Sequence, residues 1–231
     1  MNKNNGNQID QLVDIVVKEV KKNINNENMS IESYSVSDNN KDIPVGISNR
    51  HLHITEKTFA KLFGKDTEFQ KYTDLYQTGE FASKHKVTLI GPKQRPIERV
   101  RILGPFRDYD QVEVSATDAR KLGIDPPVHN SGNLKGASPL TIVGPAGSVY
   151  LKECAIIANR HIHMTDEDAA EFGVADGDFC KVRYGGEKGT IFENVLVRTK
   201  DSYKLQIHLD TDDGNAAGIE NGDYVEFYGK M

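Results

Sequence analysis

Two pairs of histidines have a spacing that could bind a metal ion. The segment Asn-Arg-His-x-His occurs twice, at residues 49–53 and 159–163. In a β-strand, residues i and i+2 point to the same face, so the two histidines of each copy can converge on one ion. Imidazole favours zinc, although cobalt, iron and nickel share this ligand type. We therefore predict two metal-binding pairs, His51 with His53 and His161 with His163.

Both pairs belong to a longer internal repeat. Residues 45–55 read VGISNRHLHIT and residues 155–165 read AIIANRHIHMT, and a second echo relates residues 173–178 to residues 218–223. A lone His-x-His is weak support for a metal site, whereas two copies within such a repeat are much stronger. The alternative is that the repeat preserves a fold element and the histidines bond only to backbone. We interpret the repeat as two related β-barrels that face one site.

Two further residues become candidate ligands only if a cation lies nearby. Glu113 lies in the run QVEV and His208 in the run LQIHL. Taken alone, His208 is typical of a satisfied histidine on a half-buried strand, and Glu113 of a solvated strand residue. A buried, unpaired carboxylate is costly, and an adjacent cation would remove that cost.

Arg107 is the candidate anion-binding residue. It follows the Gly104-Pro105 turn and precedes Glu113 by six residues. A guanidinium can bind phosphate oxygens as a bidentate fork, although a surface pair with Asp108 or Asp110 is the alternative. The loop at residues 131–138, SGNLKGAS, is rich in donors that could bind phosphates. Cys154 could be a thiolate nucleophile, but a buried core cysteine is more common.

The elements around these residues are mostly short β-type runs. They lie at residues 87–90, 100–103, 140–143, 155–158, 179–183, 195–198 and 205–209. Three brief helices are predicted from their caps: Thr55 to Gly64, Ser115 to Gly123 and Thr165 to Gly173. The pattern indicates a mainly β fold, built of barrels with short capping helices.

The first forty residues differ from the rest. Residues 9–24 place apolar side chains at helical spacing, with charges on the opposite face, and residues 25–41 read as an Asn- and Ser-rich linker. Such an amphipathic helix needs a partner surface for its apolar stripe. That surface is either the chain's own domain, a neighbouring subunit or another protein.

Composition limits the remaining function classes. The chain has 231 residues, a formal charge of −5 and two cysteines. The acidic balance argues against nucleic acid as a main partner, and the few cysteines favour the reducing cytosol. We find no secretory signal at the start and no apolar run long enough to span a membrane.

Together these motifs resemble the PduL-type phosphate propanoyltransferases, the phosphotransacylases associated with bacterial microcompartments. The resemblance rests on residues 45–53, 104–114, 123–128, 131–136 and 158–165, and it covers the chain from about residue 43 onward. It implies two β-barrels with a discontinuous chain path. One domain would comprise residues 41–50 and 159–231, and the other residues 51–158, after an N-terminal helix and linker at residues 1–40.

The resemblance also implies a dinuclear zinc site with two Zn²⁺ per chain. One ion would be held by His51, His53 and Glu113, and the other by His161, His163 and His208. Arg107 would contact phosphate. Coenzyme A would lie between the barrels, with contacts near Ser131, Lys135 and Asn215.

The implied reaction converts propanoyl-CoA or acetyl-CoA and phosphate into acyl phosphate and CoA, by direct attack of zinc-bound phosphate on the thioester. A dinuclear zinc hydrolase and a zinc-stapled structural module are the alternatives. The implied location is the cytoplasm, inside a microcompartment. Residues 9–24 would be an encapsulation peptide for shell proteins or a contact in a homo-oligomer.

Overall fold

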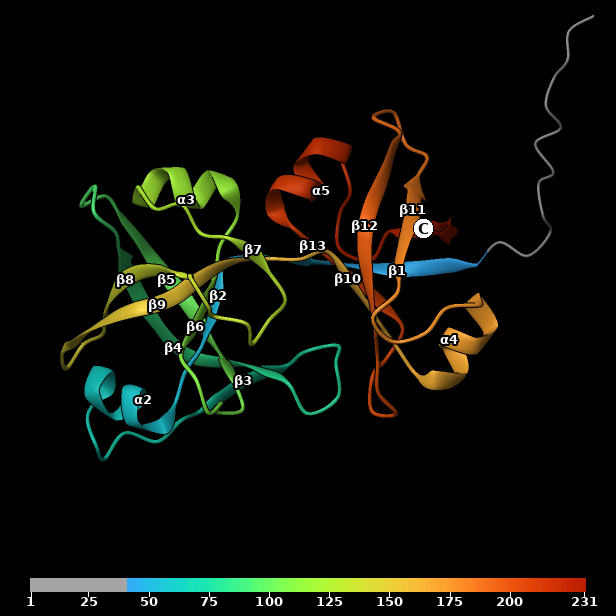
Figure 1. Cartoon of the computed structure of the whole chain (residues 1–231). Coiled ribbons are helices and arrows are strands. Elements are labelled where there is room, and N and C mark those ends of the chain that lie inside the picture. Colours follow the sequence, from blue (N-terminus) through green and yellow to red (C-terminus); the bar gives the residue numbers. More distant parts are fainter. Residues whose placement is uncertain (1–40) are drawn as a thin grey trace, which may run out of the picture. The chain divides into compact units, whose positions relative to one another are not determined.

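The computed structural model describes residues 41–231, so the predicted helix at residues 9–24 and nearly all of its linker lie outside the described residues. The described part is mainly β-structure with short helices, and its strands form two barrels (Figure 1). This confirms the predicted fold class.

We call the first of these the C-terminal barrel, because all its strands but one come from the end of the chain. Its closed strand order is β1-β13-β10-β12-β11-β14. The strands are β1 (Asp42–Ser48), β10 (His161–Met164), β11 (Phe179–Tyr184), β12 (Thr190–Thr199), β13 (Gln206–Asp210) and β14 (Tyr224–Lys230). Two helices accompany them, α4 (Asp166–Phe172) and α5 (Thr211–Ala217). Ile43, Ile162 and Ile207 are fully buried in its core.

The second, which we call the central barrel, closes because β8 pairs with both β4 and β9. Its ring runs β4-β5-β2-β6-β9-β8, with β3 beside β4 and β7 beside β9. The strands are β2 (His51–His53), β3 (Lys71–Asp74), β4 (Phe81–Ile90), β5 (Pro96–Gly104), β6 (Gln111–Glu113), β7 (Val128–His129), β8 (Ser138–Val143) and β9 (Ser148–Ala158). Its helices are α2 (Glu56–Phe63) and α3 (Ala116–Leu122).

The chain passes between the barrels at the two Asn-Arg dipeptides. Strand β1 ends at Ser48 in one barrel and β2 begins at His51 in the other. The return passage lies between Ala158 of β9 and His161 of β10. Each histidine pair forms a short strand of its own, because the segments before and after each Asn-Arg dipeptide pair with different sheets.

The helix predictions from capping residues are confirmed. The side chains of Thr55, Ser115 and Thr165 each accept a hydrogen bond from a backbone N–H of the first turn of α2, α3 and α4. Of the four helices in residues 41–231, only α5 was not predicted. It has seven residues, contains Gly214 and is capped by Asp210. A glycine inside so short a helix leaves little propensity to recognise.

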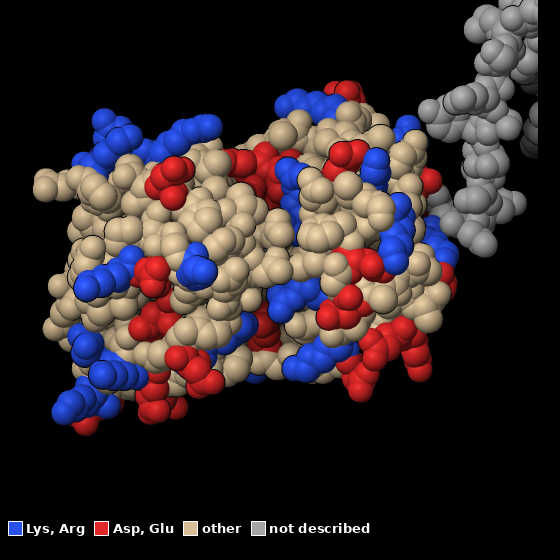
Figure 2. Space-filling model, in the orientation of Figure 1, with Lys and Arg blue, Asp and Glu red and all other residues tan. Residues whose placement is uncertain are grey.

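The surface carries charges of both signs. On the face in Figure 2, Lys and Arg side chains are interspersed with Asp and Glu. No helix within residues 41–231 combines the length and the apolar character needed to cross a membrane.

Candidate metal and phosphate site

Strand pairing brings the predicted ligands together as two groups of three. His51 of β2 lies opposite Glu113 of β6, and His161 of β10 lies opposite His208 of β13. With the second histidine of each pair, the ligand atoms within each group lie within 4.8 Å of one another. We call the groups cluster 1 and cluster 2; cluster 1 is His51, His53 and Glu113, and cluster 2 is His161, His163 and His208.

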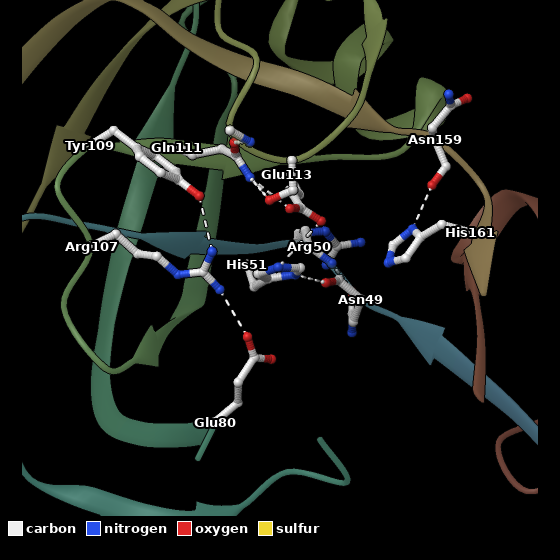
Figure 3. Close-up of polar contacts among 12 residues, drawn as sticks. Asn49, Arg50, His51, Glu80, Arg107, Tyr109, Gln111, Glu113, Asn159 and His161 are labelled. Atoms are coloured by element: carbon white, nitrogen blue, oxygen red, sulfur yellow. Dashed lines mark hydrogen bonds and ion pairs between the residues drawn. The ribbon is translucent and has the colours of Figure 1, made fainter. Parts of the chain in front are cut away.

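In cluster 1, backbone and side-chain hydrogen bonds orient the ligand atoms (Figure 3). His51 donates from Nδ1 to the Asn49 carbonyl oxygen at 2.8 Å, which leaves its Nε2 free to bind a cation. That Nε2 lies 3.4 Å from Glu113 Oε2. The other oxygen of Glu113 accepts a hydrogen bond from Gln111 Nε2 at 2.7 Å. His51 and Glu113 are thus each held by a hydrogen bond that leaves one of their ligand atoms available to the ion.

Cluster 2 has the same arrangement around its first histidine. His161 donates from Nδ1 to the Asn159 carbonyl oxygen at 2.8 Å (Figure 3). Its ring stacks on His208 at a centroid distance of 4.9 Å, and His163 stacks on Tyr203 at 4.1 Å. Stacking limits ring rotation, so all three imidazoles are held in place.

The unpaired nitrogens of both clusters fit a bound cation. His53 Nδ1, both ring nitrogens of His163, and His208 Nε2 are buried without a hydrogen-bond partner. Buried polar atoms are nearly always satisfied, so four orphans within two clusters call for a missing partner. Burial also lowers the pKa of His53, His208 and His163, the last to about 3. These imidazoles are therefore neutral, as a metal ligand must be.

Each cluster offers three protein ligands. Structural zinc sites are usually closed by four, whereas catalytic sites keep one position for water or substrate. Sets of two histidines with one carboxylate, and of three histidines, are both known for catalytic zinc. The donor sets therefore suit open, reactive metal sites better than structural staples.

Both clusters line one cavity of about 630 Å³, together with Arg107 and Ser131. The structure does not bring Lys135 or Asn215 into the lining of this cavity. It adds cationic residues that our sequence analysis did not single out, namely Arg50, Lys86, Arg99, Arg101 and Arg198. Arg50 could have been noticed, because it lies within the repeated motif. The others come from strands whose facing directions depend on the barrel geometry.

Arg107 is oriented by two side chains that the sequence analysis missed. Its Nη2 donates to Glu80 Oε1 at 2.8 Å and its Nη1 to the Tyr109 hydroxyl at 2.9 Å (Figure 3). The alternative pairing with Asp110 does not occur. Asp110 instead accepts hydrogen bonds from the Thr55 backbone N–H and the Thr58 hydroxyl. The guanidinium is thus held at the wall of the cavity by Glu80 and Tyr109.

Gln111 connects the Ser131 loop to cluster 1. Its Nε2 donates to Ser131 Oγ at 2.7 Å as well as to Glu113, and its Oε1 accepts from the Gly132 backbone N–H at 2.7 Å. The side chain is fully buried, so all three bonds are shielded from water. The loop that the sequence predicted to bind phosphates is therefore fixed to a candidate metal ligand.

Cys154 does not reach the cavity. It is fully buried in the core of the central barrel, and burial raises the pKa of its thiol to about 12. A thiol in that state is protonated and inert at neutral pH. The core interpretation of this residue is the one the structure supports.

Comparisons with known proteins identify the family of this chain. A family model described as phosphate propanoyltransferase matches residues 44–220. The phosphate propanoyltransferase of Lachnoclostridium phytofermentans is 51% identical over 79% of this chain and 85% of its own length. That of Thermotoga maritima is 44% identical over 84% of this chain and 92% of its own length. That of Salmonella typhimurium is 43% identical over 78% and 85%. The chain therefore belongs to the phosphate propanoyltransferase family and is a phosphate acyltransferase.

Proposed function

We propose that this chain transfers a propanoyl or acetyl group between coenzyme A and phosphate, with Zn²⁺ bound in both clusters. The observation that carries the proposal is the convergence of two open three-ligand clusters and Arg107 on one cavity. The relatives' name supports the propanoyl group and phosphate. We also propose two domains, residues 41–50 with 159–231, and residues 51–158.

In this proposal, Arg107 binds and orients phosphate. Glu80 and Tyr109 hold its guanidinium, so that its remaining N–H groups face the substrate. A phosphate oxygen attacks the thioester carbonyl carbon, the C–S bond breaks, and the CoA thiolate leaves with the bonding electron pair. Zn²⁺ in the clusters would supply a Lewis acid that stabilises negative charge on the reacting oxygens. Holding both substrates in one cavity can offset about 7–11 kcal/mol of the entropic barrier.

Thiol release from propanoyl-CoA and acetyl-CoA tests this function. The assay is run with and without phosphate, before and after chelation, and after Zn²⁺ is added back. Release that requires phosphate, stops on chelation and returns with Zn²⁺ is the expected result. Release without phosphate would indicate a hydrolase. If neither thioester is cleaved while the chain still binds zinc, the zinc-stapled structural module is favoured.

A direct attack predicts that Cys154 is dispensable. In the C154A variant we expect kcat within about threefold of wild type, because no covalent acyl-thiol is formed on the buried sulfur. Initial rates at varied acyl-CoA and phosphate measure this together with the kinetic pattern. Intersecting double-reciprocal lines are expected. Parallel lines, or a loss of activity in C154A at unchanged stability, would indicate a covalent intermediate.

We propose that residues 9–24, which lie outside the described residues, bind microcompartment shell proteins. Their apolar stripe supports this, and a contact within a homo-oligomer is the alternative. We expect deletion of residues 1–35 to leave kcat unchanged and to abolish co-purification with shell proteins. Size-exclusion chromatography of both forms separates the two cases, since a loss of oligomer without any shell binding would support the alternative.

Lys135 and Asn215 remain proposed coenzyme A contacts.

A further inference from the structure

The two clusters are built from a duplicated unit that extends beyond the Asn-Arg-His-x-His motif. In each barrel, the strand that carries the third ligand begins with a glutamine opposite the second histidine: Gln111 faces His53, and Gln206 faces His163. The third ligand follows two residues later, and a helix cap follows after two more, at Ser115 or Asp210. The unit thus couples each histidine pair to one strand and the helix after it.

Each copy of the unit also contains an ion pair that spans it. Arg50 donates from Nε to Asp118 Oδ2 at 2.7 Å. Arg160 donates from Nε and Nη2 to the two carboxylate oxygens of Asp213 at 3.0 and 2.8 Å. Each arginine directly precedes the histidine pair at a crossover between barrels, and each aspartate lies five residues after the third ligand.

The two aspartates lie at the third position of a helix, where a carboxylate can accept a hydrogen bond from the backbone of its own N-cap residue. Asp118 and Asp213 are the third residues of α3 and α5, where an acidic side chain can cap its own helix. In α4 the equivalent Asp168 does so, accepting a hydrogen bond from the Thr165 backbone N–H at 2.9 Å. Asp118 and Asp213 bind the crossover arginines instead, and their side chains are only 7% and 17% exposed. The same diversion in both copies indicates a shared role.

Each ion pair links the two chain segments that carry the ligands of one cluster. The arginine is covalently joined to the histidine-pair strand, and the aspartate to the helix that follows the third-ligand strand. The carbonyl of Asn49 or Asn159, in the same crossover, orients the first histidine. A displaced crossover would therefore move two ligands away from the third.

Building on the proposed zinc sites, we propose that Arg50 and Arg160 are positioning residues, each of which sets the metal affinity of one cluster. Arg50, through Asp118, fixes cluster 1, and Arg160, through Asp213, fixes cluster 2. Charge alone would act in the opposite direction, because removing a cation near a metal site strengthens cation binding. A loss of affinity on removal of either arginine is thus a signature of positioning.

The test is a zinc titration of the full-length, metal-free chain against a colorimetric chelator. The variants are R50M and R160M, each also made in H53A and H163A backgrounds, which leave only cluster 2 or cluster 1 intact. R160M is expected to lower the zinc affinity of cluster 2 about 10- to 100-fold. The zinc affinity of cluster 1 is expected to stay within about threefold of its value in the chain that keeps Arg160. R50M is expected to do the reverse. R183M is the matched control, because Arg183 is an exposed arginine 3.8 Å from Glu226.

The variants R50Q and R160Q remove the same positive charge with a polar side chain, and they repeat the test should a methionine variant fail to fold. They are expected to show the same cluster selectivity. Equal weakening of both clusters, or stability loss without any change in zinc affinity, would overturn the inference. A wild-type chain with fewer than two zinc sites would overturn it together with the metal assignment. Selective zinc loss in a chain without transferase activity would refute only the proposed function.

Discussion

The H163A variant is expected to lose at least about 10³-fold in kcat/KM for phosphate-dependent CoA release, together with one zinc ion per chain. His163 contributes one of three ligands to cluster 2, and both of its ring nitrogens are buried without another partner. Lewis-acid stabilisation is worth several kcal/mol, and each 1.36 kcal/mol changes a rate tenfold. Thiol release and elemental analysis of the same sample measure both effects.

His85 provides the control for this variant. It is half-buried, and its Nδ1 is likewise buried without a hydrogen-bond partner, but it packs against Phe59, Phe63 and Phe69 and belongs to neither cluster. The H85F variant is expected to keep both zinc ions and wild-type kcat/KM. Full activity of H163A, or equal metal loss in H85F, would remove the basis for a catalytic metal in cluster 2.

The R107M variant is expected to lower kcat/KM for phosphate about 10²–10³-fold without changing zinc content. Glu80 and Tyr109 contact Arg107 through its guanidinium. Methionine keeps the length of the side-chain stem and removes every hydrogen-bond donor. Losing one preorganised donor to a reacting oxyanion typically costs a factor of this size. Initial rates at varied phosphate concentration, with saturating acyl-CoA, measure the effect.

R107K separates charge from geometry. Lysine supplies a point charge but no bidentate fork, so we expect it to recover little of the lost kcat/KM. The exposed R183M variant serves as the control for general loss of positive charge. An unchanged KM and kcat for phosphate in R107M would show that the anion binds elsewhere in the cavity, for example beside Arg101 or Arg198.

Features with local causes were predictable from the sequence. The helices that begin after Thr55, Ser115 and Thr165 follow from caps and a terminal glycine a few residues apart. The histidine pairs follow from the two-residue period of a strand, and their duplication made the metal prediction specific. Helix α5 was missed because its cap and first turn are a run of Asp and Thr that also suits a loop.

Features that depend on strand register could not be derived in this way. Glu113 becomes a partner of His51 only because β6 pairs with β2, about sixty residues apart in sequence. Glu80 reaches Arg107 from the connection between β3 and β4, and no local sequence pattern predicts that contact. The role of Asp118 and Asp213 was likewise invisible, since a helix-capping aspartate and one that binds a distant arginine look alike in sequence.

The exchange of strands between the barrels also constrains how the protein is made. Strand β1 is synthesised first, yet it pairs with β13 and β14, and Val45 lies opposite Ile207. A ribosome must therefore release almost the whole chain before this barrel can close, and the edges of β1 stay unpaired until then. Pairings this distant slow folding and leave time for aggregation. We expect truncation anywhere before β13 to yield insoluble chains, so a smaller catalytic fragment cannot be cut from this fold.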